Sequence, residues 1–281
     1  MRFSFKKQQG FTLIELITVI VILGVIATSI TTFLRYGAQS YTDAADREEL
    51  ISTARFVIER LNREVRHALP NSARELNGSG KQCLEFTPIA RSAIYVDIPV
   101  APEAASNTVT LAPFASSLIT NSSQVSVYAL NSDDIYNNAN DVIASFDPSA
   151  AISPLLTVDD LDVDDNNPPP TVVLTLNAAT QFRADSPTKR LYFIETAVSY
   201  CLENGNLYRY QNYARSALDD TPIFDTNNRS LMAEHLENTT LPFSVVEATL
   251  QRNALVLVRL EFFLNLEIIV FNNEIQVPNV P

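Results

Sequence analysis

The chain has 281 residues, of which 46% are hydrophobic, and its 32 acidic and 20 basic side chains give a formal charge of −12. This length suffices for a membrane segment plus one large domain or two small ones, and the acidic balance excludes a general nucleic-acid footprint. The two cysteines, Cys83 and Cys201, lie far apart and in no CxxC pair, which argues against a zinc site. In an exported domain they could form one disulfide.

The first predicted element is an apolar helix near the N-terminus. Between Phe11 and Ile30 the chain has twenty residues, and Glu15 is the only charged one. A helix of that length spans about 30 Å, the thickness of the hydrocarbon core of a bilayer. The basic residues Arg2, Lys6 and Lys7 precede it. This positive flank predicts that the N-terminus stays in the cytoplasm while the bulk of the chain is translocated.

Three interpretations of this segment compete. A cleaved secretory signal has an apolar region of about 7–15 residues. The present run is longer, although Val25-Ile26-Ala27 imitates a cleavage site. A plain signal anchor accounts for the length and the basic flank but leaves Glu15 unexplained, because a charge inside a bilayer costs about 2.5–3.5 kcal/mol on insertion scales.

The third interpretation uses every residue of the segment. A short basic leader ends in Gly10 and is followed by Phe11-Thr12-Leu13-Ile14-Glu15 and a continuous apolar run. This arrangement resembles the class III signal of type IV pilins and type II secretion pseudopilins. The resemblance implies that a prepilin peptidase cuts after Gly10 and methylates Phe11, and that Glu15, fifth in the mature chain, acts in assembly. Cleavage removes three positive charges and no negative ones, which takes the formal charge from −12 to −15.

A physical role for Glu15 follows from its position. A carboxylate in hydrocarbon needs a cation, and the free amine of Phe11 in an adjacent subunit can supply one. Since only one axial stagger satisfies both charges, such pairing would fix the register between packed helices. The alternative is that Glu15 lies close enough to the membrane interface to stay hydrated.

The helix is expected to continue beyond the membrane segment and to end at Pro70. Apolar residues there recur at steps of three and four, which predicts an amphipathic helix packed on a domain. Gly37 marks a weak point between the two halves of the helix. The stripe could instead be a coiled-coil seam, but it is too short for sustained heptads. The apolar positions are Leu50, Ala54, Val57, Ile58, Leu61, Val65 and Ala68.

Strand patterns follow Pro70. Residues 82–86 alternate between apolar and polar side chains, and so does the run from Leu191 to Leu202. Asn204-Gly205, between two alternating arms, predicts a β-hairpin. This hairpin puts three tyrosines on strands instead of in a binding site: Tyr200, Tyr208 and Tyr210.

The longest alternation runs from Leu255 to Phe271 and predicts a single strand. A turn at Asn272-Asn273 and a last short strand at residues 274–277 are expected to follow. One face of the long strand is predicted to carry Leu260, Phe262, Leu264, Leu266 and Ile268.

Residues 99–188 are less regular and are predicted to form long loops of the same domain, with one strand at residues 171–176. Within them an aspartate-rich stretch suggests calcium. An EF-hand register that starts at Asp160 gives oxygen ligands at Asp162 and Asp164. It fails because a glycine is needed at the sixth position and a glutamate at the twelfth, where the chain has Asp165 and Thr171. A solvated acidic loop is therefore favoured, and a looser calcium site at these aspartates remains the alternative.

No catalytic motif is visible. The chain has no GxSxG, HExxH or P-loop pattern. His67 falls in the last turn of the predicted helix, where a cation suits the helix dipole, so a structural role is favoured. We therefore expect no enzyme activity, and no cofactor unless calcium binds.

Cys83 and Cys201 both fall in predicted strands that could lie side by side in one sheet. We therefore favour a disulfide over two free thiols. In the chain-entropy model, closing so long a loop stabilises the fold substantially.

These elements and the resemblance together predict an α+β, type IV pilin-like fold, in which a long helix packs on an antiparallel β-sheet head with long loops. The expected segments are a leader at 1–10, a transmembrane and assembly helix at 11–34, its amphipathic continuation at 35–69, and a β-rich periplasmic or extracellular head at 70–281.

The head resembles one branch of the family. Its size, the CLEF strand from Cys83 and the CLENGNLYRY hairpin from Cys201 resemble the branch of W-type minor pilins and J-type pseudopilins. The ending Asn279-Val280-Pro281 resembles the MshO family of the mannose-sensitive haemagglutinin (MSHA) pilus. The resemblance implies a low-abundance subunit of a Gram-negative bacterium that primes assembly. It would begin as a single-pass inner-membrane protein with a periplasmic head and end at the pilus tip on the cell surface.

Partners implied by the resemblance are other minor and major pilins, bound through the N-terminal helix, the prepilin peptidase and the inner-membrane assembly platform. Two alternative functions remain open. One is a J-type pseudopilin of a type II secretion system, and the other is a tip adhesin that uses residues 99–188 to bind a surface receptor.

Overall fold

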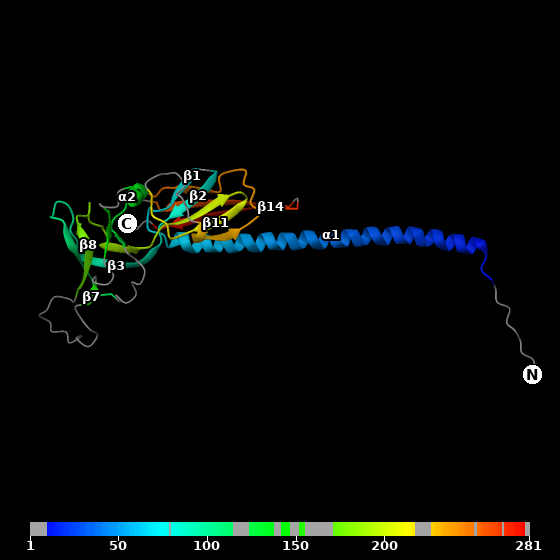
Figure 1. Ribbon diagram of the computed structural model, residues 1–281, viewed down its shortest axis with the longest axis horizontal. Coiled ribbons are helices and arrows are strands. Elements are labelled where there is room, and N and C mark those ends of the chain that lie inside the picture. Colours follow the sequence, from blue (N-terminus) through cyan, green and yellow to red (C-terminus); the bar gives the residue numbers. More distant parts are fainter. Residues whose placement is uncertain are drawn as a thin grey trace, which may run out of the picture. The chain divides into compact units, whose positions relative to one another are not determined.

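The computed structural model describes residues 10–78, 80–114, 124–137, 142–146, 152–154, 171–216, 226–249, 252–265 and 267–278. The chain divides into two compact units, residues 1–50 and residues 51–281. The described part of the first unit is mainly helical. The second unit contains the rest of that helix and all the described strands (Figure 1).

Helix α1 runs from Leu13 to Arg66, over 54 residues. Its large apolar side chains between Leu13 and Leu34 are exposed. Among the described residues α1 is the one helix long and apolar enough to cross a membrane. Isoleucine and valine are mediocre helix formers in water, but a bilayer offers the backbone no partners outside the helix, and this favours helix in an apolar run.

In the second unit α1 buries the predicted apolar stripe. Ala54, Val57, Leu61 and Val65 are fully buried, while Ile58 is half-buried. Because these residues recur every three or four positions, they lie on one face of the helix. The prediction of an amphipathic continuation packed on the head is confirmed for these four residues.

The helix ends earlier than predicted, at Arg66 and not at Pro70. The chain leaves the helix because the backbone N–H of Leu69 donates to the carbonyl of Thr87, at 2.7 Å, and Ala68 forms a β-bridge with Pro88. His67 lies just after the helix, with its Nδ1 2.7 Å from the carbonyl oxygen of Arg63.

The second unit contains a five-stranded antiparallel sheet with the strand order β1-β2-β10-β11-β12. The predicted hairpin is confirmed, since β10 and β11 pair and Asn204 and Gly205 between them have φ of +50° and +77°. Asparagine and glycine adopt this left-handed conformation at low cost. The strands are β1 (Arg74–Gly78), β2 (Lys81–Phe86), β10 (Val198–Glu203), β11 (Asn206–Tyr210) and β12 (Arg229–Ala233).

A three-stranded antiparallel sheet follows in the order β13-β14-β15, with bounds Phe243–Val246, Ala254–Leu264 and Glu267–Val277. The predicted single strand from Leu255 to Phe271 is wrong. The chain turns at Asn265, whose φ is +49°, and Asn272-Asn273 lie inside β15. An asparagine tolerates the left-handed region, and the reversal lets the apolar runs on its two sides pair with each other.

The turn also changes the face on which Ile268 lies. Ile268 pairs with Phe263, so it lies on the face opposite to Leu260, Phe262 and Leu264. Leu266 is outside the described residues.

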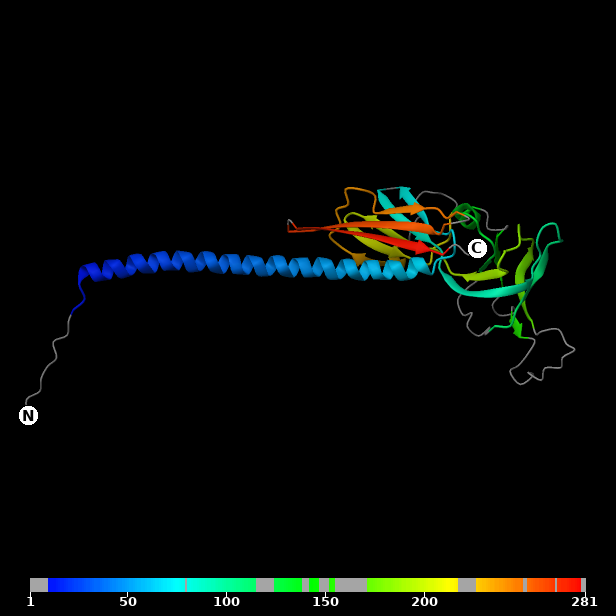
Figure 2. The same cartoon turned by 180° about the vertical axis from the view of Figure 1, so that it is seen from behind.

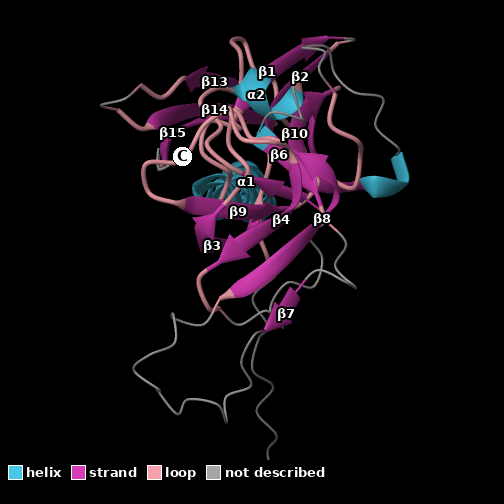
Figure 3. Cartoon of the chain, turned by 90° about the vertical axis from the view of Figure 1, so that its left-hand side faces the viewer, coloured by secondary structure: helices cyan, strands magenta, loops and turns pink. Residues whose placement is uncertain are grey.

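The third sheet has seven strands in the order β6-β5-β9-β3-β4-β8-β7. Figure 3 shows β9, β3, β4 and β8 side by side. The sheet has its own core, in which Phe146 and Phe193 meet edge to face with ring centroids 5.6 Å apart. The strands are β3 (Ile89–Asp97), β4 (Ser106–Leu111), β5 (Gln124–Ser126), β6 (Ile143–Ser145), β7 (Ile152–Pro154), β8 (Val172–Thr180) and β9 (Arg190–Ile194).

Two predictions about this region are corrected. The described part of residues 99–188 holds more than the one strand predicted, because it contains β4 to β8 and the short helix α2 (Ser132–Tyr136). Strands of three residues are too short to show alternation, whereas the predicted strand at 171–176 is confirmed as β8. The run from Leu191 to Leu202 is two strands, since β9 and β10 belong to different sheets. A short 3₁₀ helix, η3 (Thr226–Asn228), precedes β12.

Candidate functional site

The N-terminal motif lies immediately before and within the first turn of α1. Gly10 and Phe11 precede the helix and are exposed, so the bond between them is accessible. Residues 1–9 of the predicted leader lie outside the described residues. Glu15 lies in the first turn of α1, where a carboxylate also suits the positive end of the helix dipole.

Glu15 and Thr12 form one half of a capping box at the start of α1. Glu15 Oε2 accepts from the backbone N–H of Thr12 at 3.4 Å and from its hydroxyl at 3.3 Å. Since α1 begins at Leu13, Thr12 occupies the N-cap position and Glu15 the third helical position, the spacing typical of this motif. Sequence reasoning treated Glu15 only as an intermolecular group and missed this role, although the T-x-x-E pattern is the signal for it.

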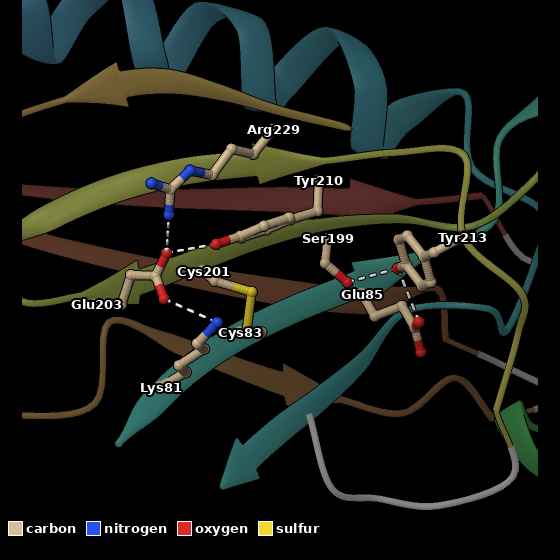
Figure 4. Close-up of a disulfide and its surroundings, with 9 residues drawn as sticks. All are labelled: Lys81, Cys83, Glu85, Ser199, Cys201, Glu203, Tyr210, Tyr213 and Arg229. Carbon is tan, nitrogen blue, oxygen red and sulfur yellow. Dashed lines mark hydrogen bonds and ion pairs between the residues drawn. A yellow bond between two sulfur atoms is a disulfide. The ribbon is translucent and has the colours of Figure 1, made fainter. Parts of the chain in front are cut away.

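In the head, Cys83 and Cys201 are joined by a disulfide with an S–S distance of 2.06 Å. They are direct register partners on β2 and β10, which pair although 118 positions separate the two cysteines along the chain. Both are buried and pack with Leu76 and Tyr210 in a small cluster (Figure 4).

Glu203 holds the ends of three strands together near this disulfide. It accepts from Lys81 Nζ at 2.8 Å, from Arg229 Nη1 at 3.2 Å and from the hydroxyl of Tyr210 (Figure 4). Burial alone would raise the pKa of Glu203, but the hydrogen bonds from Lys81 and Tyr210 outweigh it and hold the pKa below its usual value. The carboxylate therefore stays charged and links β2, β11 and β12 through their side chains.

On the other side of the disulfide, Glu85 is fully buried. It accepts from the hydroxyl of Tyr213 at 2.8 Å, and that hydroxyl lies 2.6 Å from Ser199 Oγ (Figure 4). Burial raises the pKa of Glu85, and the nearby Arg74 and Tyr213 oppose this rise without cancelling it. These contacts fix strand positions, and none of them presents a nucleophile to solvent.

A hollow of about 240 Å³ lies beside Tyr95 in the seven-stranded sheet, lined in part by Asp97, Glu103, Asp185 and Lys189. The Tyr95 hydroxyl and the Lys189 ammonium both donate to Asp185. Sequence reasoning missed this hollow because its lining comes from two segments that lie far apart in sequence, residues 95–103 and 185–189.

Metal binding finds no support in the part of the chain that the structure describes, where no group of three or more histidine, cysteine, aspartate or glutamate side chains could hold an ion. The weak calcium candidates Asp160, Asp162 and Asp164 lie outside the described residues.

Comparison with known families bears on the N-terminal motif. A family model of the prokaryotic N-terminal methylation motif matches residues 5–31, which include Gly10, Phe11, Glu15 and the first turns of α1. Searches of curated proteins and of solved structures give no match to the chain.

The motif, the long apolar helix and the antiparallel sheets together are consistent with an α+β, type IV pilin-like fold. More particularly, the motif supports a type IV pilin or pseudopilin that a peptidase processes and that assembles with other proteins of that kind. The apolar α1 indicates membrane anchoring.

Proposed function

We propose that this protein is a minor pilin that primes assembly and caps the tip of a type IV pilus, of the MSHA type. The observation that carries the proposal is the segment from Gly10 to Glu15, with its accessible Gly10–Phe11 bond, at the start of a 54-residue helix. The ending that resembles the MshO family favours the MSHA type.

Before assembly, the subunit is a single-pass protein of the inner membrane with its head in the periplasm. The basic residues before α1 support this orientation, because positive flanks stay in the cytoplasm. After extraction, the apolar face of α1 packs with the helices of other minor and major pilins, and the head lies on the cell surface at the fibre tip.

Glu15 has a hydrogen-bond partner both in the single chain and in the fibre. In the single chain the carboxylate accepts from Thr12. Cleavage after Gly10 creates a cationic amine on Phe11, and in the fibre Glu15 exchanges its contacts with Thr12 for that amine on a neighbouring subunit. In an apolar fibre core, a pair in which both partners are charged is stronger than the hydrogen bonds with Thr12, in which only the carboxylate is charged. The exchange therefore favours one axial register.

The large head supports a low copy number. It combines sheets of five, three and seven strands in one unit of residues 51–281. A body of this size is difficult to repeat along a thin fibre but can occupy its end once. The proposal assigns the head a structural role and no catalysis.

Mass spectrometry of the mature N-terminus, in cells with and without the prepilin peptidase, tests the class. We expect a chain that starts at N-methylated Phe11 when the peptidase is present and at Met1 when it is absent. A start at Thr28 in both strains would identify an ordinary cleaved signal and overturn the proposal.

Counting fibres tests the priming role. Glu15→Ala should reduce the number of fibres per cell, whereas Glu59→Ala, on the exposed face of the same helix, should leave it unchanged. Unchanged fibre number in the Glu15 variant contradicts the register mechanism, and a copy number similar to that of the major pilin contradicts the tip position.

The hollow beside Tyr95 favours a second candidate, a tip adhesin. Deleting residues 99–188 would remove strands of the seven-stranded sheet, so point variants give the sharper test. Asp97→Asn and Glu103→Gln change the lining without touching a core residue. Lost adhesion with a normal fibre number supports the adhesin, and normal adhesion excludes this hollow as the receptor site.

The J-type pseudopilin of a type II secretion system differs in the process it serves. Removal of the gene should then abolish export of secreted enzymes and leave surface fibres intact. Loss of fibres with normal export supports the pilus.

A further inference from the structure

β15 is an edge strand of the three-stranded sheet. β15 pairs with β14 on one side, and no other described strand pairs with it. In a strand with one neighbour, the N–H and C=O groups of alternate residues point away from that neighbour. Figure 2 shows the β14–β15 hairpin, coloured orange to red.

Apart from two glutamates, this edge lacks the sequence features by which proteins prevent strand pairing. β15 has 11 residues and contains no proline, lysine or glycine. Its register with β14 runs from Ala254↔Val277 to Leu264↔Glu267 without a bulge. Long, regular edges without such protection are templates for a further strand.

The strand is also held rigidly at its C-terminal half. Ile275 and Val277 are fully buried, and Asn273 Nδ2 donates to Asn62 Oδ1 of α1 at 3.1 Å. Phe271 meets Phe262 edge to face with ring centroids 6.0 Å apart. A strand that docks here would therefore pair with a β15 edge that is already ordered.

The outward side chains of β15 define the chemistry of the occupant. From the hairpin tip inward they are first apolar, with Ile268 65% and Val270 40% exposed, and then polar at Asn272, Glu274 and Gln276. Both charged residues of β15, Glu267 and Glu274, are carboxylates. A matching strand carries β-branched or other apolar side chains opposite Ile268 and Val270 and a lysine or arginine opposite Glu274.

We propose that β15 binds an extended, basic and alternately apolar segment of another protein by strand addition. This inference does not depend on whether the subunit serves a pilus or a secretion system. A second copy of the chain is disfavoured, because it carries the same carboxylates and the same formal charge of −12.

The test uses a synthetic decapeptide of alternating valine and polar residues, two of them lysine, with blocked ends. Its binding to the full chain in detergent is measured by fluorescence anisotropy. The control peptide has the same sequence with alternate amides on one edge N-methylated. Because strand addition needs those N–H donors, we expect N-methylation to weaken binding about tenfold or more.

A matched pair of protein variants locates the site. Ile268→Lys/Val270→Lys alters the β15 edge, and Ile94→Lys/Val96→Lys alters a strand, β3, that is paired on both sides. Ile94 and Val96 are 55% and 56% exposed, so the control removes similar apolar surface and adds the same charge. We expect the first variant to weaken peptide binding about tenfold and the second to leave it within about twofold.

Four results overturn the proposal. The first is equal binding of the N-methylated peptide, which shows that the N–H groups of the peptide backbone do not contribute to binding. The second is an equal loss of binding in the two lysine variants, and the third is no saturable binding by the unmodified chain. The fourth is self-association of the chain, seen by sedimentation, that Ile268→Lys/Val270→Lys abolishes, since the occupant is then a second copy. If the edge variant fails to fold, the peptide comparison on the unmodified chain still decides.

Discussion

Arg74 and Glu85 form a buried ion pair between register partners on β1 and β2, with Arg74 Nε 2.6 Å from Glu85 Oε2 and side-chain exposures of 7% and 0%. Arg74 also donates to the carbonyl of Ser216 at 2.7 Å and lies 3.7 Å from the ring centroid of Tyr136. The pair thus joins the edge of the five-stranded sheet to two segments distant in sequence.

Glu85→Gln should lower the free energy of unfolding by about 3–5 kcal/mol, because it leaves the buried Arg74 without its counter-charge. Urea unfolding of the full chain in detergent, followed by circular dichroism, measures this. Arg74→Met/Glu85→Gln should recover part of the loss, since the two changes share one interaction. Lys189→Met, at the exposed pair with Asp185, should cost less than about 1 kcal/mol and serves as the control. A similar loss in the control variant contradicts the special role of burial.

The disulfide should contribute about 2–4 kcal/mol to the free energy of unfolding, because it restricts the unfolded chain over a span of 118 residues. We expect this loss in Cys83→Ala/Cys201→Ala, measured by urea unfolding. A reducing agent should destabilise the natural chain in the same way and leave the double variant unchanged. An effect of the reductant on the double variant would show that it acts elsewhere.

Leu61→Ala should destabilise the head by about 2–5 kcal/mol, since Leu61 is fully buried on the inward face of α1 and its removal leaves a cavity. Phe56→Ala is the matched control on the same helix, because Phe56 is exposed, and it should change the unfolding free energy by about 0.5 kcal/mol or less. Equal losses in the two variants would contradict the packing of this face on the head.

Protonation of Asp134 in acid should destabilise the head. Burial alone would raise the pKa of Asp134, but the paired hydrogen bonds from Arg183, at 2.7 and 2.8 Å, and those from the backbone N–H groups of Leu130 and Asn131 outweigh it and lower the pKa. Because the pKa is lower in the folded state, the charged carboxylate stabilises the fold at pH values above the pKa of the unfolded state, about 3.9. This stabilisation is lost as the pH falls through the pKa of the folded state.

Unfolding free energies measured between pH 2 and pH 6 test this effect. Asp134→Asn should be less stable than the natural chain at pH 6, and the difference should vanish at pH 2. Asp133→Asn, an exposed change in the same helix, should follow the curve of the natural chain. A constant difference across the range would show that Asp134 acts through its shape and not its charge.

Thr12→Ala should loosen the start of α1, because it removes the N-cap side chain that faces Glu15. Hydrogen exchange of the full chain in detergent should become faster at residues 16–19, because Leu16 is the first residue of α1 whose N–H donates to a carbonyl at the start of the helix, that of Thr12. Thr12→Ser keeps the hydroxyl and should exchange at the natural rate. Unchanged exchange in Thr12→Ala would mean that the backbone contact to Glu15 alone holds the first turn.

Local patterns predicted the parts of this fold that depend on near neighbours in sequence. The stripe of Ala54, Val57, Leu61 and Val65, the turn at Asn204-Gly205 and the β8 strand all follow from spacing or from residues that accept a left-handed backbone. The N-terminal motif could be recognised in the sequence for the same reason, since cleavage and membrane insertion depend on a contiguous segment.

Non-local pairing accounts for the errors. The helix stops at Arg66 because Leu69 bonds to Thr87, a contact that no local pattern carries. The turn at Asn265 was missed because its flanking apolar runs read equally well as one strand, and only their pairing separates them. The seven-stranded sheet was missed because its three-residue strands gain stability from neighbours far along the chain.

The bond between Cys83 and Cys201 also sets how the protein responds to mechanical force. When a chain is pulled from its two ends, tension passes through the sulfur atoms and bypasses everything between the cysteines. Since they are 118 positions apart, about 400 Å of extended chain stays out of reach of the pull. All seven strands of the seven-stranded sheet lie inside this loop. A subunit pulled from its two ends would therefore lengthen through its helix, β1 and the strands β11 to β15, while the seven-stranded sheet carries no load.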